Sequence, residues 1–275
     1  MPSYKLVATD LDGTLLNSAG VVSQENIDAI HEMTKMGVFF VPSSGRAFWE
    51  LPPCVRSIPD ARYFICSDGA VIYDTQKEEP LDDRSFRGDD IRRALDCMLA
   101  GKTHLLLHHK GHVYVDAQKH NEEGYIAHRV PPSFRRAMYE LAVAGDNFKE
   151  FCYGLDSIEM VTVFFASDED LNECRERLLA DGAFSVTSTE PTNLEIFRKD
   201  AGKGNALDRL AHILGADRSE TIAVGDNFND LENFAHAGLA LAMGNALPVA
   251  KEAAHRIICK NDEHAMVYIL ENLLK

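Results

Sequence analysis

Two short apolar segments that each end in aspartate constrain the fold of this chain more than any other feature. Leu6-Val7-Ala8 predicts a buried strand, and Asp10, Asp12 and Gly13 follow it closely. A second apolar segment ends at Asp226. In an open α/β sheet, ligands bind beyond the carboxyl ends of the strands, where these carboxylates would lie. Asp and Gly are also ordinary turn residues, so a site there needs partners elsewhere in the chain.

Further polar groups follow predicted strands or begin predicted helices. Ser44-Gly45-Arg46 comes after the apolar residues 38–41, and Lys203 opens an amphipathic helix. Asn229 and Asp230 follow the second aspartate-ended strand and begin another helix. Turn chemistry alone does not explain four such clusters, so we interpret them as parts of one site.

Taken in order, the four motifs resemble those of the haloacid dehalogenase-like phosphohydrolases. The Gly-Asp-x-x-Asn-Asp sequence at Asp226 resembles the Cof-type (class IIB) branch, which carries a large cap domain. The resemblance covers about the first 75 residues and those from about 190 to the end. It implies a doubly wound, mostly parallel, Rossmann-like α/β core sheet. The chain departs from the family pattern at Asp68, where Asn is usual, near the expected start of the cap hinge.

The length of 275 residues favours two domains. Residues 84–187 contain their own pattern of helices and strands, including a hairpin around Lys110-Gly111. We therefore expect an inserted α+β cap domain at 84–187, which interrupts a core made of residues 1–83 and 188–275.

A magnesium site is predicted from the paired carboxylates. A carboxylate can attack phosphorus only when a cation offsets the repulsion between the two sets of oxygens. Mg²⁺ prefers hard oxygen ligands, and Asp10 and Asp226 can each supply a carboxylate. The resemblance implies that the backbone carbonyl of Asp12 is a further ligand and that Asp230 acts behind the ligands.

The same residues predict the chemistry. Attack by Asp10 would give an aspartyl-phosphate, which divides the hydrolysis into two steps. Asp12 lies close enough to protonate the leaving oxygen and then to activate water. Lys203 and the cation are expected to hold Asp10 ionised, leaving Asp12 as the group that titrates.

Phosphate oxygens would be bound by several groups around Asp10. The hydroxyl of Ser44 and the backbone N–H groups of Gly45 and Leu11 can donate hydrogen bonds to them, and Lys203 belongs to the same set. Asn229 resembles the family's phosphate-contacting amide. Arg46 is either a further site residue or a structural partner of a core carboxylate.

The charge of the chain limits its partners. Acidic residues outnumber basic ones by 43 to 28, for a formal charge of −15, which argues against nucleic acid or an anionic membrane as a partner.

The six cysteines lack Cys-x-x-Cys spacing, and neither a signal peptide nor a transmembrane segment is visible. We expect a cytoplasmic protein that is a monomer or a homodimer.

The resulting hypothesis is a Mg²⁺-dependent phosphatase of small phosphorylated metabolites, with sugar phosphates favoured by the resemblance. A phosphomutase or other phosphotransferase could use the same aspartyl-phosphate. A phospho-accepting signalling domain is disfavoured, because Asp12 would have no purpose in a slow switch.

Specificity is expected to come from the insert. We interpret its histidines as surface residues, because no carboxylate or cysteine completes a metal site at ligand spacing. His108, His109, Tyr114 and Glu159 lie on predicted strands and are candidates for substrate contacts.

Overall fold

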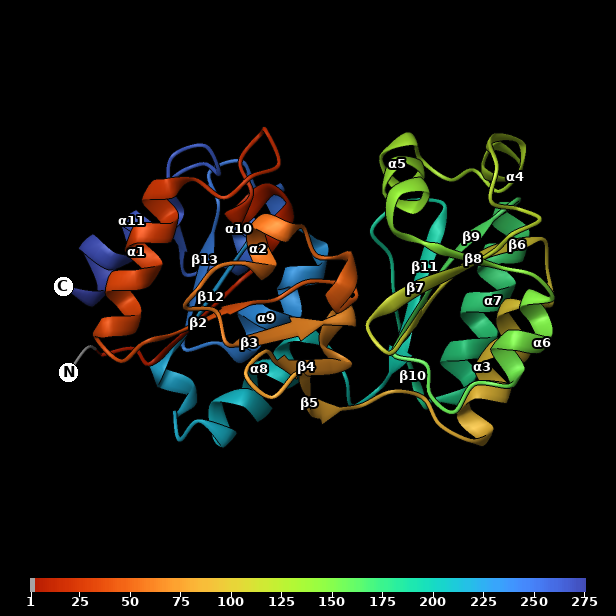
Figure 1. Cartoon of the computed structure of the whole chain (residues 1–275), viewed down its shortest axis with the longest axis horizontal. Helices are drawn as coiled ribbons and strands as arrows, with labels where there is room; N and C mark the ends of the chain where they lie inside the picture. The colour runs from red at the N-terminus through yellow and green to blue at the C-terminus, as the bar shows by residue number, and fades with distance from the viewer. Residues whose placement is uncertain (1–2) are drawn as a thin grey trace. The chain divides into compact units, whose positions relative to one another are not determined.

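The computed structural model describes residues 3–275, and these residues form two compact units (Figure 1). The first unit comprises residues 3–46, 51–82 and 202–275. The second unit comprises residues 47–50 and 83–201.

The first unit is built on a five-stranded parallel sheet in the order β14-β13-β12-β1-β2. β1 lies between β2 and β12, with Leu6 opposite Phe39 and Thr221. All residues of β1, β12 and β13 are buried, as expected for parallel strands covered on both faces. The predicted α/β fold is confirmed. The strands are β1 Leu6–Thr9, β2 Phe39–Pro42, β12 Thr221–Gly225, β13 Leu239–Ala242 and β14 Arg256–Ile257.

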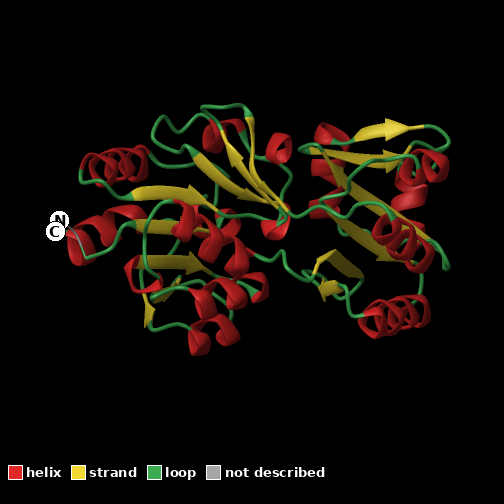
Figure 2. Cartoon of the chain, turned by 90° about the horizontal axis from the view of Figure 1, so that it is seen from below, coloured by secondary structure: helices red, strands yellow, loops and turns green. Residues whose placement is uncertain are grey.

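Helices flank the strands of this unit (Figure 2). The hydroxyl of Ser23 accepts the N–H of Asn26 and caps the first helix, which buries Ile30 and Met33. α1 packs against α11, and α8 against α9. The helices are α1 Gln24–Lys35, α2 Pro53–Arg56, α8 Lys203–Ile213, α9 Leu231–His236, α10 Pro248–Ala253 and α11 Ala265–Ile269.

A small sheet of three strands, in the order β3-β4-β5, completes the first unit. A bridge between Ser43 and Ile65 connects the end of β2 with β3. The strands are β3 Tyr63–Cys66, β4 Val71–Asp74 and β5 Glu79–Asp83.

The second unit contains a six-stranded sheet in the order β10-β11-β9-β6-β7-β8. Its pairs are antiparallel except for β7 with β8. The strands are β6 Thr103–His109, β7 His112–Asp116, β8 Val143–Gly145, β9 Met160–Phe165, β10 Phe184–Thr187 and β11 Asn193–Arg198. The helices are α3 Asp89–Met98, α4 Glu122–Ala127, α5 Pro132–Leu141, α6 Phe148–Tyr153 and α7 Asp168–Asp181.

Both faces of this sheet are buried. Leu105 and Leu107 of β6 belong to an apolar cluster with residues of α3 and α7, whereas Leu106 belongs to another cluster with Tyr125 of α4 and Met138 of α5. Alternate residues of a strand point to opposite faces, so β6 is apolar throughout its middle.

The second boundary of the insert differs from the prediction. The sequence predicts that residues 188–201 belong to the core, but β11 pairs antiparallel with β9 and β10 in the second unit. The core unit resumes at Gly202, immediately before α8. Within residues 3–275, no helix has both the length and the apolar character needed to cross a bilayer.

Candidate active site

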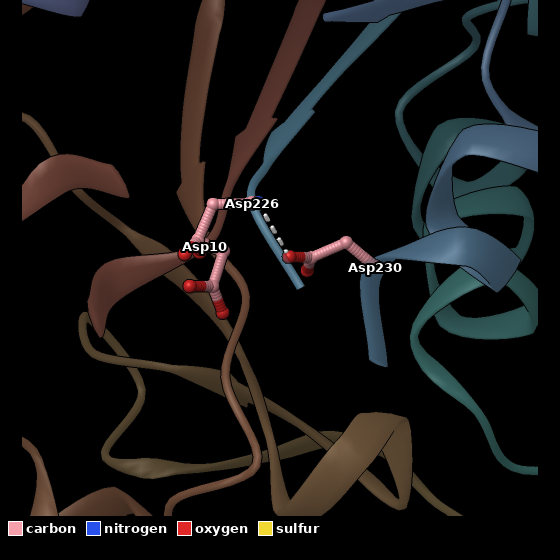
Figure 3. Close-up of side chains that lie close together, drawn as sticks. All are labelled: Asp10, Asp226 and Asp230. Atoms are coloured by element: carbon pink, nitrogen blue, oxygen red, sulfur yellow. Dashed lines mark hydrogen bonds between the residues drawn. The ribbon is translucent and has the colours of Figure 1, made fainter. Parts of the chain in front are cut away.

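Two neighbouring parallel strands bring the predicted carboxylates together. Asp10 directly follows β1 and Asp226 directly follows β12, and Thr9 lies opposite Val224 in the register. One carboxylate oxygen from each of Asp10, Asp226 and Asp230 lies within 4.8 Å of the others (Figure 3). The carboxyl ends of β1 and β12 therefore form one acidic cluster, as the sequence predicts.

Asp230 uses both of its oxygens to hold the cluster in place. Oδ1 accepts a hydrogen bond from Nζ of Lys203 at 3.1 Å. Oδ2 accepts the backbone N–H groups of Asp226 at 2.9 Å and Asn227 at 3.1 Å, the first of which is the dashed line in Figure 3. A side chain at Gly225 would lie 2.3 Å from Cγ of Asp230, so the loop requires glycine there. These bonds suit Asp230 to fixing the loop after β12.

Lys203 stands at the start of α8 and is only 1% exposed. Its Nζ donates to Oδ1 of Asp10 at 2.8 Å as well as to Asp230. Burial disfavours the charged ammonium, but the carboxylates of Asp10, Asp230 and Asp68 outweigh burial and raise the pKa of Lys203. Lys203 is therefore a buried, permanent cation beside Asp10.

The cluster still carries more negative than positive charge. Burial raises the pKa of Asp10. The nearby carboxylates of Asp230 and Asp226 raise that pKa further, whereas the ammonium of Lys203 lowers it. Burial and Asp230 also raise the pKa of Asp226 to about 6, although Thr14 donates a hydrogen bond to its Oδ1 at 3.1 Å. With three carboxylates and one ammonium, the cluster has an excess of negative charge that a divalent cation would offset.

The donor set fits Mg²⁺. The available groups are carboxylate oxygens, which this hard cation prefers. All three aspartates lie close enough together to share an ion, but three N–H donors already occupy the oxygens of Asp230. Asp10 and Asp226 are therefore the better ligands, with Asp230 behind them.

The chain after β1 forms a tight turn, Leu11–Leu15, in which Asp12 and Gly13 have non-helical dihedral angles and Gly13 has φ 78°. A side chain on Gly13 would lie 2.5 Å from Oδ2 of Asp226, so only glycine fits there. Asp12 is exposed and forms a two-pronged ion pair with Arg46, at 3.0 Å from Nε and 3.1 Å from Nη2. Arg46 thus pairs with an exposed carboxylate of the first motif, and its role in the site stays a prediction.

The segment after β2 packs against a turn in a left-handed conformation. Ser67, Asp68 and Gly69 have φ of 49°, 48° and 83°. The backbone N–H of Asp68 donates to the carbonyl of Ser44 at 3.2 Å, and a side chain at Gly45 would lie 3.1 Å from Oδ1 of Asp68. Ser44 is buried, and its hydroxyl accepts the N–H of Arg46 at 3.2 Å. This turn supports the backbone of the predicted phosphate-binding loop.

A family model described as haloacid dehalogenase-like hydrolase matches residues 7–270. The chain belongs to this family. Two relatives from Bacillus subtilis align along 98% of both chains. The putative phosphatase YxeH is 29% identical over 280 residues. The 5-amino-6-(5-phospho-D-ribitylamino)uracil phosphatase YwtE is 28% identical over 286 residues. A solved haloacid dehalogenase-like hydrolase structure from B. subtilis has a TM-score of 0.81 and 26% identity, and the match covers 98% of this chain and 100% of that one.

Two predicted phosphate contacts of this hydrolase, Asn229 and Leu11, adjoin residues of the acidic cluster in the sequence. Asn229 is partly exposed on the turn Phe228–Asp230, and within the described residues it forms no hydrogen bond with the carboxylates. Leu11 follows Asp10 directly and is fully buried, which fixes its backbone beside the expected nucleophile. Neither observation tests phosphate binding, so both assignments stay predictions.

Sequence reasoning missed two residues of the site. Thr14 bonds Asp226, and Nδ2 of Asn245 donates to the carbonyl of Gly13 at 2.7 Å. Asn245 comes from the turn after β13, far from Gly13 in sequence. A single amide in a turn has no spacing signal, whereas Thr14 adjoins Gly13 in the first motif and could have been considered.

The expectation of surface histidines in the insert is wrong for part of the set. His104, His108 and His109 are buried because β6 is covered on both faces. Nδ1 of His109 bonds the carbonyl of Ser157 at 2.7 Å, and burial lowers the pKa of His108 to about 3. Of the candidate specificity residues, Glu159 is also engaged, because it accepts the N–H of Gly111 at 2.7 Å.

Proposed function

We propose that this hydrolase is a Mg²⁺-dependent phosphatase of small phosphorylated metabolites that works through an aspartyl-phosphate. The observation that carries the proposal is the buried Asp10 carboxylate, which bonds Lys203 at 2.8 Å beside the carboxylate of Asp226. Lys203 favours the ionised, nucleophilic form of Asp10, although burial opposes it. The names of the two relatives given above, both phosphatases, support the same reaction class.

In the first step, an oxygen of Asp10 forms a bond to phosphorus and the bond from phosphorus to the leaving oxygen breaks. Asp12 gives its proton to that oxygen. In the second step, water attacks phosphorus and gives a proton to Asp12, which releases phosphate and restores Asp10. Asp12 is exposed, so the leaving group and the water can both reach it from solvent, and its ion pair with Arg46 has to open for it to carry the proton.

Mg²⁺, held by Asp10, Asp226 and the backbone carbonyl of Asp12, would neutralise the charge that separates the nucleophile from phosphate. Asp230 would keep the loop of Asp226 in place through its backbone bonds. Lys203 would contact both Asp10 and the phosphoryl group.

The remaining phosphoryl oxygens would be bound by the Ser44 hydroxyl, the N–H groups of Gly45 and Leu11, and the Asn229 amide. The left-handed turn at Asp68 supports this proposal, since it fixes the backbone beneath Ser44 and Gly45.

We propose sugar phosphates and related polyol phosphates as the substrate class, with the second unit as the cap that selects among them. The relative YwtE, by its name, acts on a phosphoribityl compound, which supports this class. Six free cysteines support a cytoplasmic location, and we propose a monomer or homodimer that binds neither nucleic acid nor membrane.

The test is hydrolysis of p-nitrophenyl phosphate and of a panel of sugar phosphates, nucleotides and phosphorylated cofactors by the purified protein. We expect phosphate release with Mg²⁺, none in EDTA, and recovery when Mg²⁺ returns. Reaction in ¹⁸O-labelled water distinguishes the enzyme classes: a phosphatase places the label in phosphate, whereas a phosphomutase moves the unlabelled group to a sugar hydroxyl. Full activity in EDTA would contradict the mechanism.

A further inference from the structure

Helix α8, which carries Lys203 as its first residue, begins without a capping side chain of its own. The residue before it, Gly202, has φ 102° and ψ 142° and offers no side chain to the helix. The first N–H groups of any α-helix lack partners within the helix. At a buried helix start such as this one, the partners have to come from another element.

Glu232 of α9 supplies them. Burial raises the pKa of Glu232, while His236 and hydrogen bonds from the backbone N–H groups of Asn205 and Gly204 oppose that rise. Nδ2 of Asn205 also donates to Oε1 of Glu232 at 3.0 Å. The carboxylate therefore accepts hydrogen bonds from the first turn of α8, and its negative charge lies at the positive end of that helix.

Two glycines make this close approach feasible. A side chain at Gly202 would lie 2.3 Å from Oε1 of Glu232, and one at Gly204 would lie 2.5 Å from the backbone oxygen of Glu232. On the opposite side, a side chain at Gly69 would lie 2.1 Å from the carbonyl of Gly202. The Gly-Lys-Gly sequence thus places Lys203 between the left-handed turn and α9.

We infer that Glu232 is a positioning residue that holds the first turn of α8 so that Lys203 reaches Asp10 and Asp230. This inference rests on the proposed function only for its effect on turnover. The contact itself does not depend on the reaction. Asp230 immediately precedes α9 and Glu232 is the second residue of α9, so the start of this helix provides both a partner of the Lys203 ammonium and an acceptor for the first turn of α8.

The kinetic test is a double-mutant cycle with an activated aryl phosphate as substrate. Glu232→Ala removes the cap, and we expect kcat/KM to fall roughly 10- to 100-fold, the size that misplacement of a catalytic group produces. Glu232→Gln keeps an acceptor oxygen and should restore most of the rate. In a Lys203→Met background, Glu232→Ala should change kcat/KM by less than about twofold, because the ammonium through which Glu232 acts is absent.

The matched control is Glu220→Ala. Glu220 also accepts a backbone N–H, that of Asp217 at 2.9 Å, but it caps a turn outside the site. We expect its kcat/KM to stay within about twofold of wild type. Equal losses from Glu232→Ala in the wild-type and Lys203→Met backgrounds would overturn the inference, because they would show a general structural role.

A second readout does not require activity. An ammonium that is buried and bonded to two carboxylates exchanges slowly and gives its own ¹⁵N resonance, which Lys203→Arg would identify by its loss. We expect this signal to shift or vanish in Glu232→Ala and to persist in Glu232→Gln and Glu220→Ala. An unchanged signal in Glu232→Ala would refute the inference. If the wild-type protein hydrolyses no phosphate ester, the proposed function fails while this measurement still decides the role of Glu232.

Discussion

Asp10 is surrounded by groups that act on its charge in opposite directions. Asp230 and Asp226 repel its ionised form, and Lys203 attracts it. Asp10→Asn removes the proposed nucleophile but keeps the shape of the side chain, so we expect turnover to fall by on the order of 10⁴- to 10⁶-fold with the fold intact. Steady-state kinetics and thermal unfolding measure the two effects. A loss of stability that matches the loss of activity would identify Asp10 as structural.

Asp12 offers a separate prediction for the two proposed steps. Asp12→Asn cannot exchange protons, so we expect slow turnover but formation of the aspartyl-phosphate from an aryl phosphate with a good leaving group. Rapid-quench trapping of the phosphorylated protein measures the first step. A pH–rate profile unchanged from wild type would contradict the acid–base role of Asp12.

Asp68 is the position at which the chain departs from the family pattern. Substitutions there test whether the left-handed turn strains the backbone. Asn and Asp tolerate φ near 50° better than other side chains with a Cβ, so Asp68→Asn should preserve the turn. Asp68→Ala should cost about 1–2 kcal/mol of unfolding free energy more than Asp68→Asn. Urea unfolding measures the difference, and equal stabilities for the two variants would argue against backbone strain at this position.

The sequence revealed the carboxylates because each follows an apolar strand, and Lys203 because it opens an amphipathic helix. It did not reveal Glu232. From the sequence alone, Glu232 is predicted to be an ordinary exposed helix residue, two positions after the motif that ends at Asp230. The role of Glu232 depends on how closely α8 and α9 approach each other. Packing between two helices of this kind produces no residue pattern in the sequence that could predict it.

Among the elements, β11 shows where pattern analysis fails. Leu194-Glu-Ile-Phe197 reads as a strand in either domain, because periodicity indicates burial but not the neighbouring strand. The core strands β1, β2 and β12 were easier to assign, since each precedes a motif whose residues have to meet. The structure resolves β11 by its hydrogen bonds to β9 and β10.

His104 of β6 predicts how the second unit responds to acid. It is fully buried beside Tyr125, and within the described chain neither ring nitrogen has a hydrogen-bond partner. Burial, followed by His128, Lys119 and His120, lowers its pKa from 6.5 to about 3. As the pH falls below 6.5, the unfolded chain takes up a proton at His104 while the folded protein keeps this side chain neutral. The stability that the neutral, buried His104 provides is therefore complete above pH 6.5 and is lost as the pH falls towards 3.

At pH 5 the loss amounts to about 2 kcal/mol relative to pH 7.5. His104→Phe removes the titration, so we expect a smaller difference in unfolding free energy between these two pH values. The fluorescence of Trp49, the single tryptophan and part of the second unit, provides the measurement in urea. The exposed His212→Phe is the control, and an unaltered pH dependence in His104→Phe would contradict the prediction.

For the whole molecule, the formal charge of −15 and the uncompensated acidic cluster predict stabilisation by a cation. At a hundred times its dissociation constant, Mg²⁺ should stabilise the fold by about 2.7 kcal/mol. The increase in Tm should be smaller below pH 6, where Asp226 takes up a proton, and should largely disappear in Asp226→Asn. Differential scanning calorimetry with and without EDTA measures it, and an equal increase in Asp226→Asn would place the ion elsewhere.

The position of β1 between β2 and β12 also has a consequence for biosynthesis. β1 needs β12 on one side, yet about 210 residues separate the two strands. At typical translation rates that interval lasts roughly 10 to 40 s, and the second unit, which ends at residue 201, is synthesised in full before β12. Any chain released before residue 221 would contain Asp10 without Asp226, so the acidic cluster can form only after β12 has been synthesised.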